Sequence, residues 1–421
     1  MNFGEKERLD VLSRFPPKQE GKTLENSQIS AFAVSLQGTS HMAGNNIPCQ
    51  DYSDIRWMEE AQVLLAGIAD GVGSCALSHW GAYFAVCCAL DFIEKEIEVR
   101  CEGGKYELTN IEEIQEILIG AFHAAQDGVE QKADEAQQAV FNFQSTLTVV
   151  VYDGLHVYCC HCGDDGVVVQ EQGGTVKMIT KRIKGDEANS VYPLQSGPSR
   201  WQVTGAKNPV SGFVMATDGV LDNFVPVFPD YYGVNYSQGI YYPFMKPAME
   251  HLAEGEGREA AEETLDNYKA FLNSEEYRRI VKDDITLIAV VSPEQMKKSE
   301  EPRFNVNIWN TVYEEHRKAV RLRLAGKAVE DGEIPLCALE KQTERETEKQ
   351  NEEPDARQKE PQKKSQKKRF VRRLSKPIWF LGGLMAGILI IGTISFFSGR
   401  GVRDQPETEK PVAASALEQR D

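Results

Sequence analysis

The chain has 421 residues, of which 41% are hydrophobic and 26% are charged, and its formal net charge at pH 7 is −17. This length allows two or three folded units, and the hydrophobic share is sufficient for a core. A chain this acidic offers no broad positive surface, which excludes a general nucleic-acid binder. The nine cysteines follow no disulfide-like spacing and indicate reduced thiols in a cytosolic protein.

The N-terminal part is polar up to the first apolar run. Residues 1–28 contain no apolar stretch typical of a signal peptide and are expected to be flexible. A first strand is predicted at 29–36, where Ile, Ala, Phe and Val predominate. It leads into a polar loop that contains His41 and ends at the pair Gln50-Asp51.

Three later apolar strands are each bordered by Asp. One ends at Asp70, and the following Gly71 has no Cβ, so backbone can approach a ligand closely there. A second ends at Asp218, and the pair Asp283-Asp284 directly precedes a third. Because no basic cluster lies beside them in the sequence, these carboxylates indicate oxygen ligands for a hard cation, Mg²⁺ or Mn²⁺.

Helices and strands come in separate runs along the chain. Apolar residues at helical spacing predict helices at 77–99 and 110–136, and Asn110 is a suitable N-cap for the second. Two strands are predicted before these helices, at 52–57 and 62–69, and others after them, at 144–152, 155–162, 167–171, 175–180 and 285–291. This arrangement predicts an α+β fold with antiparallel sheets.

Two segments between these elements interrupt the pattern. Residues 181–209 lack periodicity and are predicted to form a long loop, a type of segment that is often functional. A single helix is predicted at 258–282, directly before the last strand.

The C-terminal third contains segments of different composition. Residues 293–339 are predicted to be a helical extension, and the charged stretch 340–376 is too poor in apolar residues to fold. Residues 377–399 carry no charge, and about 20 apolar residues at about 1.5 Å each span a bilayer. Eight Lys or Arg between 363 and 376 place the preceding chain in the cytoplasm and the tail, 400–421, outside.

Six short motifs, in this order, resemble those of the PP2C-type (PPM) metal-dependent protein phosphatases, and the resemblance covers about 29–292. The motifs are Gln50-Asp51, 69–73, 144–147, 162–164, 216–220 and 283–286. The resemblance implies a PP2C-like α-β-β-α sandwich, in which helix pairs flank two antiparallel sheets. It also implies a centre of two, or three, Mn²⁺ or Mg²⁺ ions that hydrolyses phosphoserine and phosphothreonine on proteins.

The resemblance further implies roles for individual residues. The metal ligands it implies are Asp70 as a bridge between two ions, Gly71 through its carbonyl, Gln50 through its amide oxygen, Asp218, Asp283, and Asp164 at a third-metal position. The catalytic residues it implies are Asp70 and Asp51, the latter orienting water at the metals. Two divalent ions about 3.5–4 Å apart can activate water and stabilise an in-line displacement, so no Ser, Cys or His nucleophile is required.

The chain departs from the family pattern at three positions. Gln50 stands where most members have Glu, although some bacterial members have Gln, and it brings no charge. Asn46 stands where the phosphate-binding Arg is expected, and His41 is the candidate for that contact, the alternative being an ordinary loop residue. Val72 replaces a His that acts as general acid in some members, so water would protonate the leaving group.

Two hypotheses about function follow from these residues. The first is a membrane-anchored protein serine/threonine phosphatase with a cytoplasmic catalytic domain, whose partners are phosphorylated proteins, namely a Ser/Thr kinase and its substrates. The second is a pseudophosphatase, which would use the same fold as a membrane-tethered module that binds phosphoproteins. Gln50 and the missing Arg are the features that keep the second hypothesis open.

Overall fold

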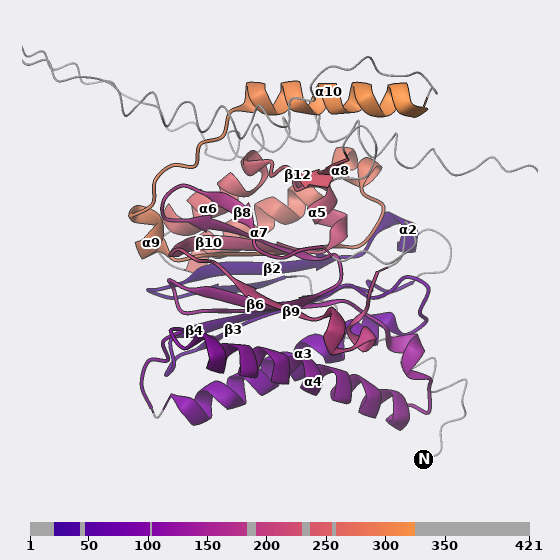
Figure 1. Cartoon of the computed structure of the whole chain (residues 1–421), viewed down its shortest axis with the longest axis vertical. Helices are drawn as coiled ribbons and strands as arrows, with labels where there is room; N and C mark the ends of the chain where they lie inside the picture. Colours follow the sequence, from indigo (N-terminus) through magenta and orange to yellow (C-terminus); the bar gives the residue numbers. More distant parts are fainter. Residues whose placement is uncertain are drawn as a thin grey trace, which may run out of the picture.

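The computed structural model describes residues 21–42, 47–101, 103–182, 191–229, 236–254 and 258–324. Two antiparallel sheets lie face to face in these residues, and helices cover the outer face of each (Figure 1). The five-stranded sheet has the order β3 (Tyr52–Met58), β4 (Val63–Ala69), β5 (Leu147–Tyr152), β6 (Val157–Cys162), β9 (Gln202–Gly205). The six-stranded sheet has the order β1 (Lys22–Glu25), β2 (Ser30–Leu36), β13 (Ile285–Val291), β10 (Val210–Ala216), β7 (Gly166–Glu171), β8 (Val176–Met178).

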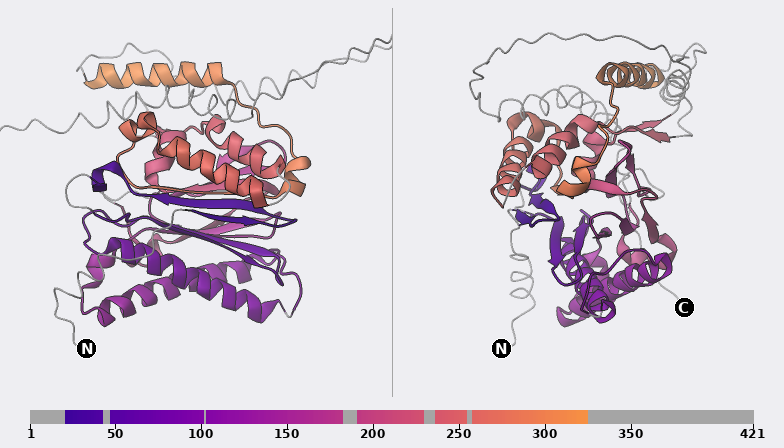
Figure 2. Two further views of the ribbon diagram at one scale, coloured as in Figure 1. Left: turned by 180° about the vertical axis from the view of Figure 1, so that it is seen from behind. Right: turned by 90° about the vertical axis from the view of Figure 1, so that its left-hand side faces the viewer.

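The helices are divided between the two outer faces, as the front and rear views agree (Figures 1 and 2). The long pair α3 (Ser78–Arg100) and α4 (Ile111–Glu135) covers the five-stranded sheet. The six-stranded sheet carries α5 (Asp218–Phe224), α6 (Tyr242–Glu254), α7 (Arg258–Leu272) and α8 (Glu275–Ile280). Smaller elements are α2 (Thr39–Met42), the hairpin β11 (Val227–Pro229) and β12 (Tyr236–Gln238), α9 (Pro293–Lys297) and α10 (Val306–Leu324), which lies over the helices of that layer.

The central strands are buried on both faces because each sheet lies between its partner sheet and a helix layer. In β4, Leu64 and Ile68 join the core between the sheets, while Val63 and Leu65 join the core beneath α3 and α4. This alternation is the two-residue period of a strand. An uninterrupted apolar strand therefore ends at the sheet edge, where its next residue is Asp70.

Strand register brings the Asp-containing ends of the strands together. In the five-stranded sheet Tyr52 pairs with Ala69, so Asp51 and Asp70 lie at the same end. In the six-stranded sheet Ala216 pairs with Leu287, so the residues after β10 and those before β13 meet there too. The strand β13 comes last in the chain but lies inside its sheet, hydrogen-bonded to β2 on one side and to β10 on the other.

The structure confirms two antiparallel sheets with paired helices as the arrangement predicted from the sequence. The helices predicted at 77–99 and 110–136 are α3 and α4, within a residue or two at each end. Asn110 caps α4 as expected, because its side chain accepts a hydrogen bond from the backbone N–H of Glu113.

Several elements differ from the prediction. The range expected to be flexible contains β1, and the predicted loop 181–209 contains β9. The predicted single helix 258–282 is two helices, because Ser274 starts α8 by accepting a hydrogen bond from Tyr277 N at 3.3 Å. The helices α5 and α6 were not predicted, the latter because it contains Pro247, a residue that usually ends a helix.

The described part of the chain ends within the predicted helical extension, where α10 packs Trp309 against Tyr241 with 5.4 Å between ring centroids. The predicted tether, membrane helix and tail (340–376, 377–399 and 400–421) lie outside the described residues. Among the described helices, none is both long and apolar enough to cross a bilayer.

Candidate metal centre

Carboxylates from both sheets gather where the strand ends meet. Each lies beside the end of a different strand: Asp70 after β4, Asp51 before β3, Asp218 after β10, Asp283 before β13 and Asp165 before β7. Burial has the largest effect on the pKa of Asp70, and the carboxylates that raise it further are those of Asp51, Asp218, Asp165 and Asp283. The structure therefore brings together Asp51, Asp70, Asp218 and Asp283, four of the residues that the resemblance implies for the site.

Asp70 is held by its main chain. The backbone N–H of Asp70 donates to Thr146 Oγ1 at 2.7 Å, and Thr146 N donates to the Asp70 carbonyl at 2.8 Å. The same Thr146 hydroxyl donates to Asp165 Oδ2 at 2.6 Å. One threonine thus links the backbone of Asp70 to the carboxylate of Asp165.

The backbone packs so closely at position 71 that only a glycine fits there. A Cβ at this position would lie 2.7 Å from the carbonyl oxygen of Gln50 and 2.9 Å from atoms of Ser78. The backbone N–H of Gly71 donates to that same carbonyl at 3.1 Å. The buried side chain of Gln50 donates from Nε2 to Ser78 Oγ at 2.6 Å, which positions its amide beside the turn after Asp70.

The carboxylates of the cluster are held close to one another away from water. Burial, together with repulsion from neighbouring carboxylates, raises the pKa of Asp51, Asp70 and Asp165 well above the ordinary value, and raises the pKa of Asp218 to about 8. Burial also raises the pKa of Asp283. The repulsion within such a cluster is relieved by a cation of high charge.

The donor atoms fit a hard divalent cation, since they are all oxygens. Asp165 adds an orphaned buried atom, because its Oδ1 has no hydrogen-bond partner. Within the described residues, no three His, Cys, Asp or Glu side chains form a preformed ligand group for an ion.

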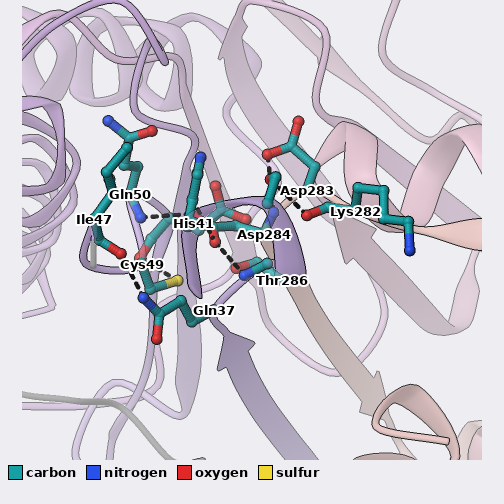
Figure 3. A network of polar contacts seen from close by, with 12 residues as sticks. Gln37, His41, Ile47, Cys49, Gln50, Lys282, Asp283, Asp284 and Thr286 are labelled. Carbon is teal, nitrogen blue, oxygen red and sulfur yellow. Dashed lines mark hydrogen bonds and ion pairs between the residues drawn. The ribbon is translucent and has the colours of Figure 1, made fainter. Parts of the chain in front are cut away.

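Asp284 connects the loops around this cluster (Figure 3). Its buried carboxylate accepts hydrogen bonds from Gly38 N and Gln50 N, each at 2.5 Å, and from His41 Nδ1 at 3.0 Å. The hydrogen bond to Asp284 raises the pKa of His41. His41, predicted as a phosphate contact, thus lies at the edge of the cluster as an ion-pair partner of Asp284.

Three residues that matter here were not among the predicted site residues: Asp165, Asp284 and Arg182. Asp165 and Asp284 each follow another Asp, and the sequence alone does not show which member of a pair faces inward. Arg182 lies 18 residues after the predicted third-metal ligand Asp164, and its Nε donates to the Asp164 carbonyl at 2.9 Å. The residues around Arg182 in the sequence do not indicate that the chain comes back to Asp164 at this point.

A family model described as "Protein phosphatase 2C" matches residues 37–267. No curated protein matches the chain.

Among solved structures, the chain is similar to the S. agalactiae serine/threonine phosphatase with 14% identity, 63% of this chain and 99% of that chain covered, and a TM-score of 0.41. It is similar to RsbX in complex with magnesium with 17% identity, 65% and 99% covered, and a TM-score of 0.36. It is also similar to the catalytic domain of the serine/threonine protein phosphatase PstP in complex with two manganese ions, with 15% identity, 63% and 98% covered, and a TM-score of 0.40.

Proposed function

Because the chain belongs to the protein phosphatase 2C family of serine/threonine protein phosphatases, we propose that the carboxylate cluster binds two Mn²⁺ or Mg²⁺ ions and hydrolyses phosphoserine and phosphothreonine on proteins. The observation that carries this proposal is the set of buried carboxylates with raised pKa values at the meeting point of both sheets. A phosphate dianion would be repelled there without bound cations.

The ligand set is the one that the resemblance to the family implies. The residues that would hold the ions are Asp70, Gly71 through its carbonyl, Gln50 through its amide oxygen, Asp218 and Asp283. When bound, the ions supply an activated water and neutralise the charge of the phosphate. The turn after β4 brings Gly71 against Gln50, so these two residues lie side by side.

Two further residues, Asp51 and His41, have proposed roles beside the ions. Asp51 would orient water, the role that the resemblance implies for it, and its Oδ2 accepts a hydrogen bond from Thr217 Oγ1 at 2.8 Å, next to Asp218. His41, whose pKa is raised by its hydrogen bond to Asp284, would supply a positive charge near the anionic substrate when it is protonated.

The test of this proposal, and a prediction, concerns Gln50→Glu. A Glu places an anionic oxygen where the amide now lies, so Coulomb attraction for a divalent ion increases. Mg²⁺ gives up its water reluctantly, so we expect the parent to be more active in Mn²⁺ than in Mg²⁺ and the variant to reach half-maximal rate at lower concentrations of either ion. The measurement is initial rate on phosphopeptides against metal concentration, for the full-length parent and variant.

The same experiment separates the enzyme from a pseudophosphatase. Ser78→Ala is the matched control, because it removes the hydrogen-bond partner of the Gln50 amide without adding charge. This control should not lower the metal concentration needed for half-maximal rate, whereas Gln50→Glu should. A parent without turnover at saturating Mn²⁺ on several phosphopeptides would decide for a module that binds phosphoproteins.

We also propose that the chain is a single-pass membrane protein with its catalytic domain in the cytoplasm, acting on a Ser/Thr kinase and its substrates. The support is the sequence of 377–399 and the eight basic residues before it. We expect reporter fusions to give a cytoplasmic signal at the N-terminus and an extracytoplasmic signal at the C-terminus. Replacing the eight basic residues with Gln should weaken this orientation, and an extracytoplasmic N-terminal signal in the parent would contradict it.

A further inference from the structure

A buried arginine lies against the predicted third-metal ligand. The side chain of Arg182, a residue that follows β8, is 4% exposed. Its Nε donates to the Asp164 carbonyl, and its Nη2 lies 3.9 Å from Asp164 Oδ2. Its Nη1 lies 2.5 Å from Asp222 Oδ1 on α5. The guanidinium therefore joins the turn before β7 to the helix that begins at Asp218.

This guanidinium supplies a permanent positive charge on one side of the cluster. It lies against the carboxylates of Asp164 and Asp222. The protein therefore neutralises part of the negative charge of the cluster on the Asp164 side.

We propose that Arg182 takes the place of a third metal ion at Asp164 and Asp218, so that this centre holds two ions. An ion at Asp164 would lie close to the guanidinium, and two positive charges at such short range repel each other strongly in a buried site. The Asp164 carbonyl, a further candidate ligand, already accepts the Arg182 Nε–H. The inference rests on the proposed function and deepens it.

The test counts bound ions. Full-length parent and Arg182→Met are dialysed against Mn²⁺, and the Mn²⁺ bound per chain is measured. We expect Arg182→Met to bind one more ion than the parent, because Asp164 and Asp218 lose their cationic partner. Arg182→Lys keeps the charge and should bind the same number as the parent. Arg100→Met is the matched control, because it removes an Arg paired with Glu96 on α3, away from the cluster.

Asp164→Asn provides a second arm that does not depend on Arg182→Met being folded. In the parent this change should leave the number of bound ions unchanged, and in Arg182→Met it should remove the additional ion. The inference is overturned if Asp164→Asn costs the parent an ion, or if folded Arg182→Met binds no more Mn²⁺ than the parent. A parent that binds no Mn²⁺ contradicts the proposed function instead, since the inference concerns the difference between variant and parent.

Discussion

Asp70→Asn is expected to abolish hydrolysis, with a loss of on the order of 10³-fold or more in kcat/KM, and to remove Mn²⁺ binding. The reason is that Asp70 is buried among Asp51, Asp165, Asp218 and Asp283, and is the carboxylate proposed as a ligand of both ions. Asp283→Asn should weaken mainly one ion. Initial rates and calorimetric Mn²⁺ titration of the full-length variants measure both effects.

Asp70→Asn should stabilise the metal-free protein, although it abolishes activity. Burial and repulsion raise the pKa of Asp70 in the folded state, so its contribution to stability is present below its ordinary pKa and is lost as pH rises toward the raised value. For Asp218 this contribution to stability is lost as pH rises from the ordinary pKa of 3.8 to the raised pKa of about 8. In a chelator at neutral pH, Asp70→Asn should therefore melt at a higher temperature than the parent, while added Mn²⁺ should stabilise the parent more than the variant.

Asp54→Asn is the matched control for Asp70→Asn. Asp54 is also a largely buried Asp of the five-stranded sheet, but it is neutralised by Lys22 at 2.6 Å and Arg56 at 3.0 Å. Its replacement should leave Mn²⁺ binding intact and should not stabilise the metal-free protein. Unchanged Mn²⁺ affinity in Asp70→Asn would contradict the assignment of this residue as a ligand.

Asp284→Ala is expected to lower the free energy of unfolding by about 3–5 kcal/mol and to reduce activity strongly. The carboxylate accepts two backbone hydrogen bonds, from Gly38 and Gln50, and one from His41, and hydrogen bonds to charged groups contribute about 1.5–3 kcal/mol each, not additively. Without Asp284, the loop that carries His41 and the residue before Asp51 lose a common anchor. Chemical denaturation and steady-state kinetics measure the two effects.

His41 provides a readout that loss of stability alone would not change. Asp284 raises the pKa of His41, so the stability that comes from its protonation is present below the ordinary value of 6.5 and is lost as pH rises through the raised value. Titration by nuclear magnetic resonance should show a His41 pKa above 6.5 in the parent and a lower one in Asp284→Asn. A His41 pKa that is the same in parent and variant would show that the pair does not form.

Asp153→Ala is the matched control for Asp284→Ala. Asp153 has a comparable set of partners, among them the backbone N–H groups of Leu155 and His156 and the Nδ1 of His156 at 3.0 Å. It lies in the β5–β6 turn, at the opposite end of β5 from Thr146. Its loss should reduce stability but leave kcat and KM near those of the parent. Similar kinetics for the two variants would show that Asp284 is structural alone.

The parts of the site predicted from the sequence are those defined by local patterns. An apolar run that ends in Asp shows where a buried strand reaches the sheet edge, and the structure brings Asp70, Asp218 and Asp283 together on that basis. The cap of α4 is local for the same reason, because Asn110 and Glu113 are three residues apart.

The parts that were missed depend on partners far away in the chain. The short strand β1 exists because it pairs with β2, and β9 exists because it pairs with β6, so neither needs a strong pattern of its own. Likewise, the inward position of Arg182 depends on Asp222, a residue of a helix that starts after β10. Propensity and periodicity describe segments, whereas these contacts are set by topology.

The position of β13 has a consequence for how the protein is made. One edge of β2 and one edge of β10 remain unpaired until residues 285–291 have been synthesised. Such high contact order slows folding, and exposed strand edges favour aggregation. Because Asp283 and Asp284 arrive with this strand, a nascent chain cannot complete its carboxylate cluster early, and hydrolysis of phosphoproteins begins after nearly the whole domain has left the ribosome.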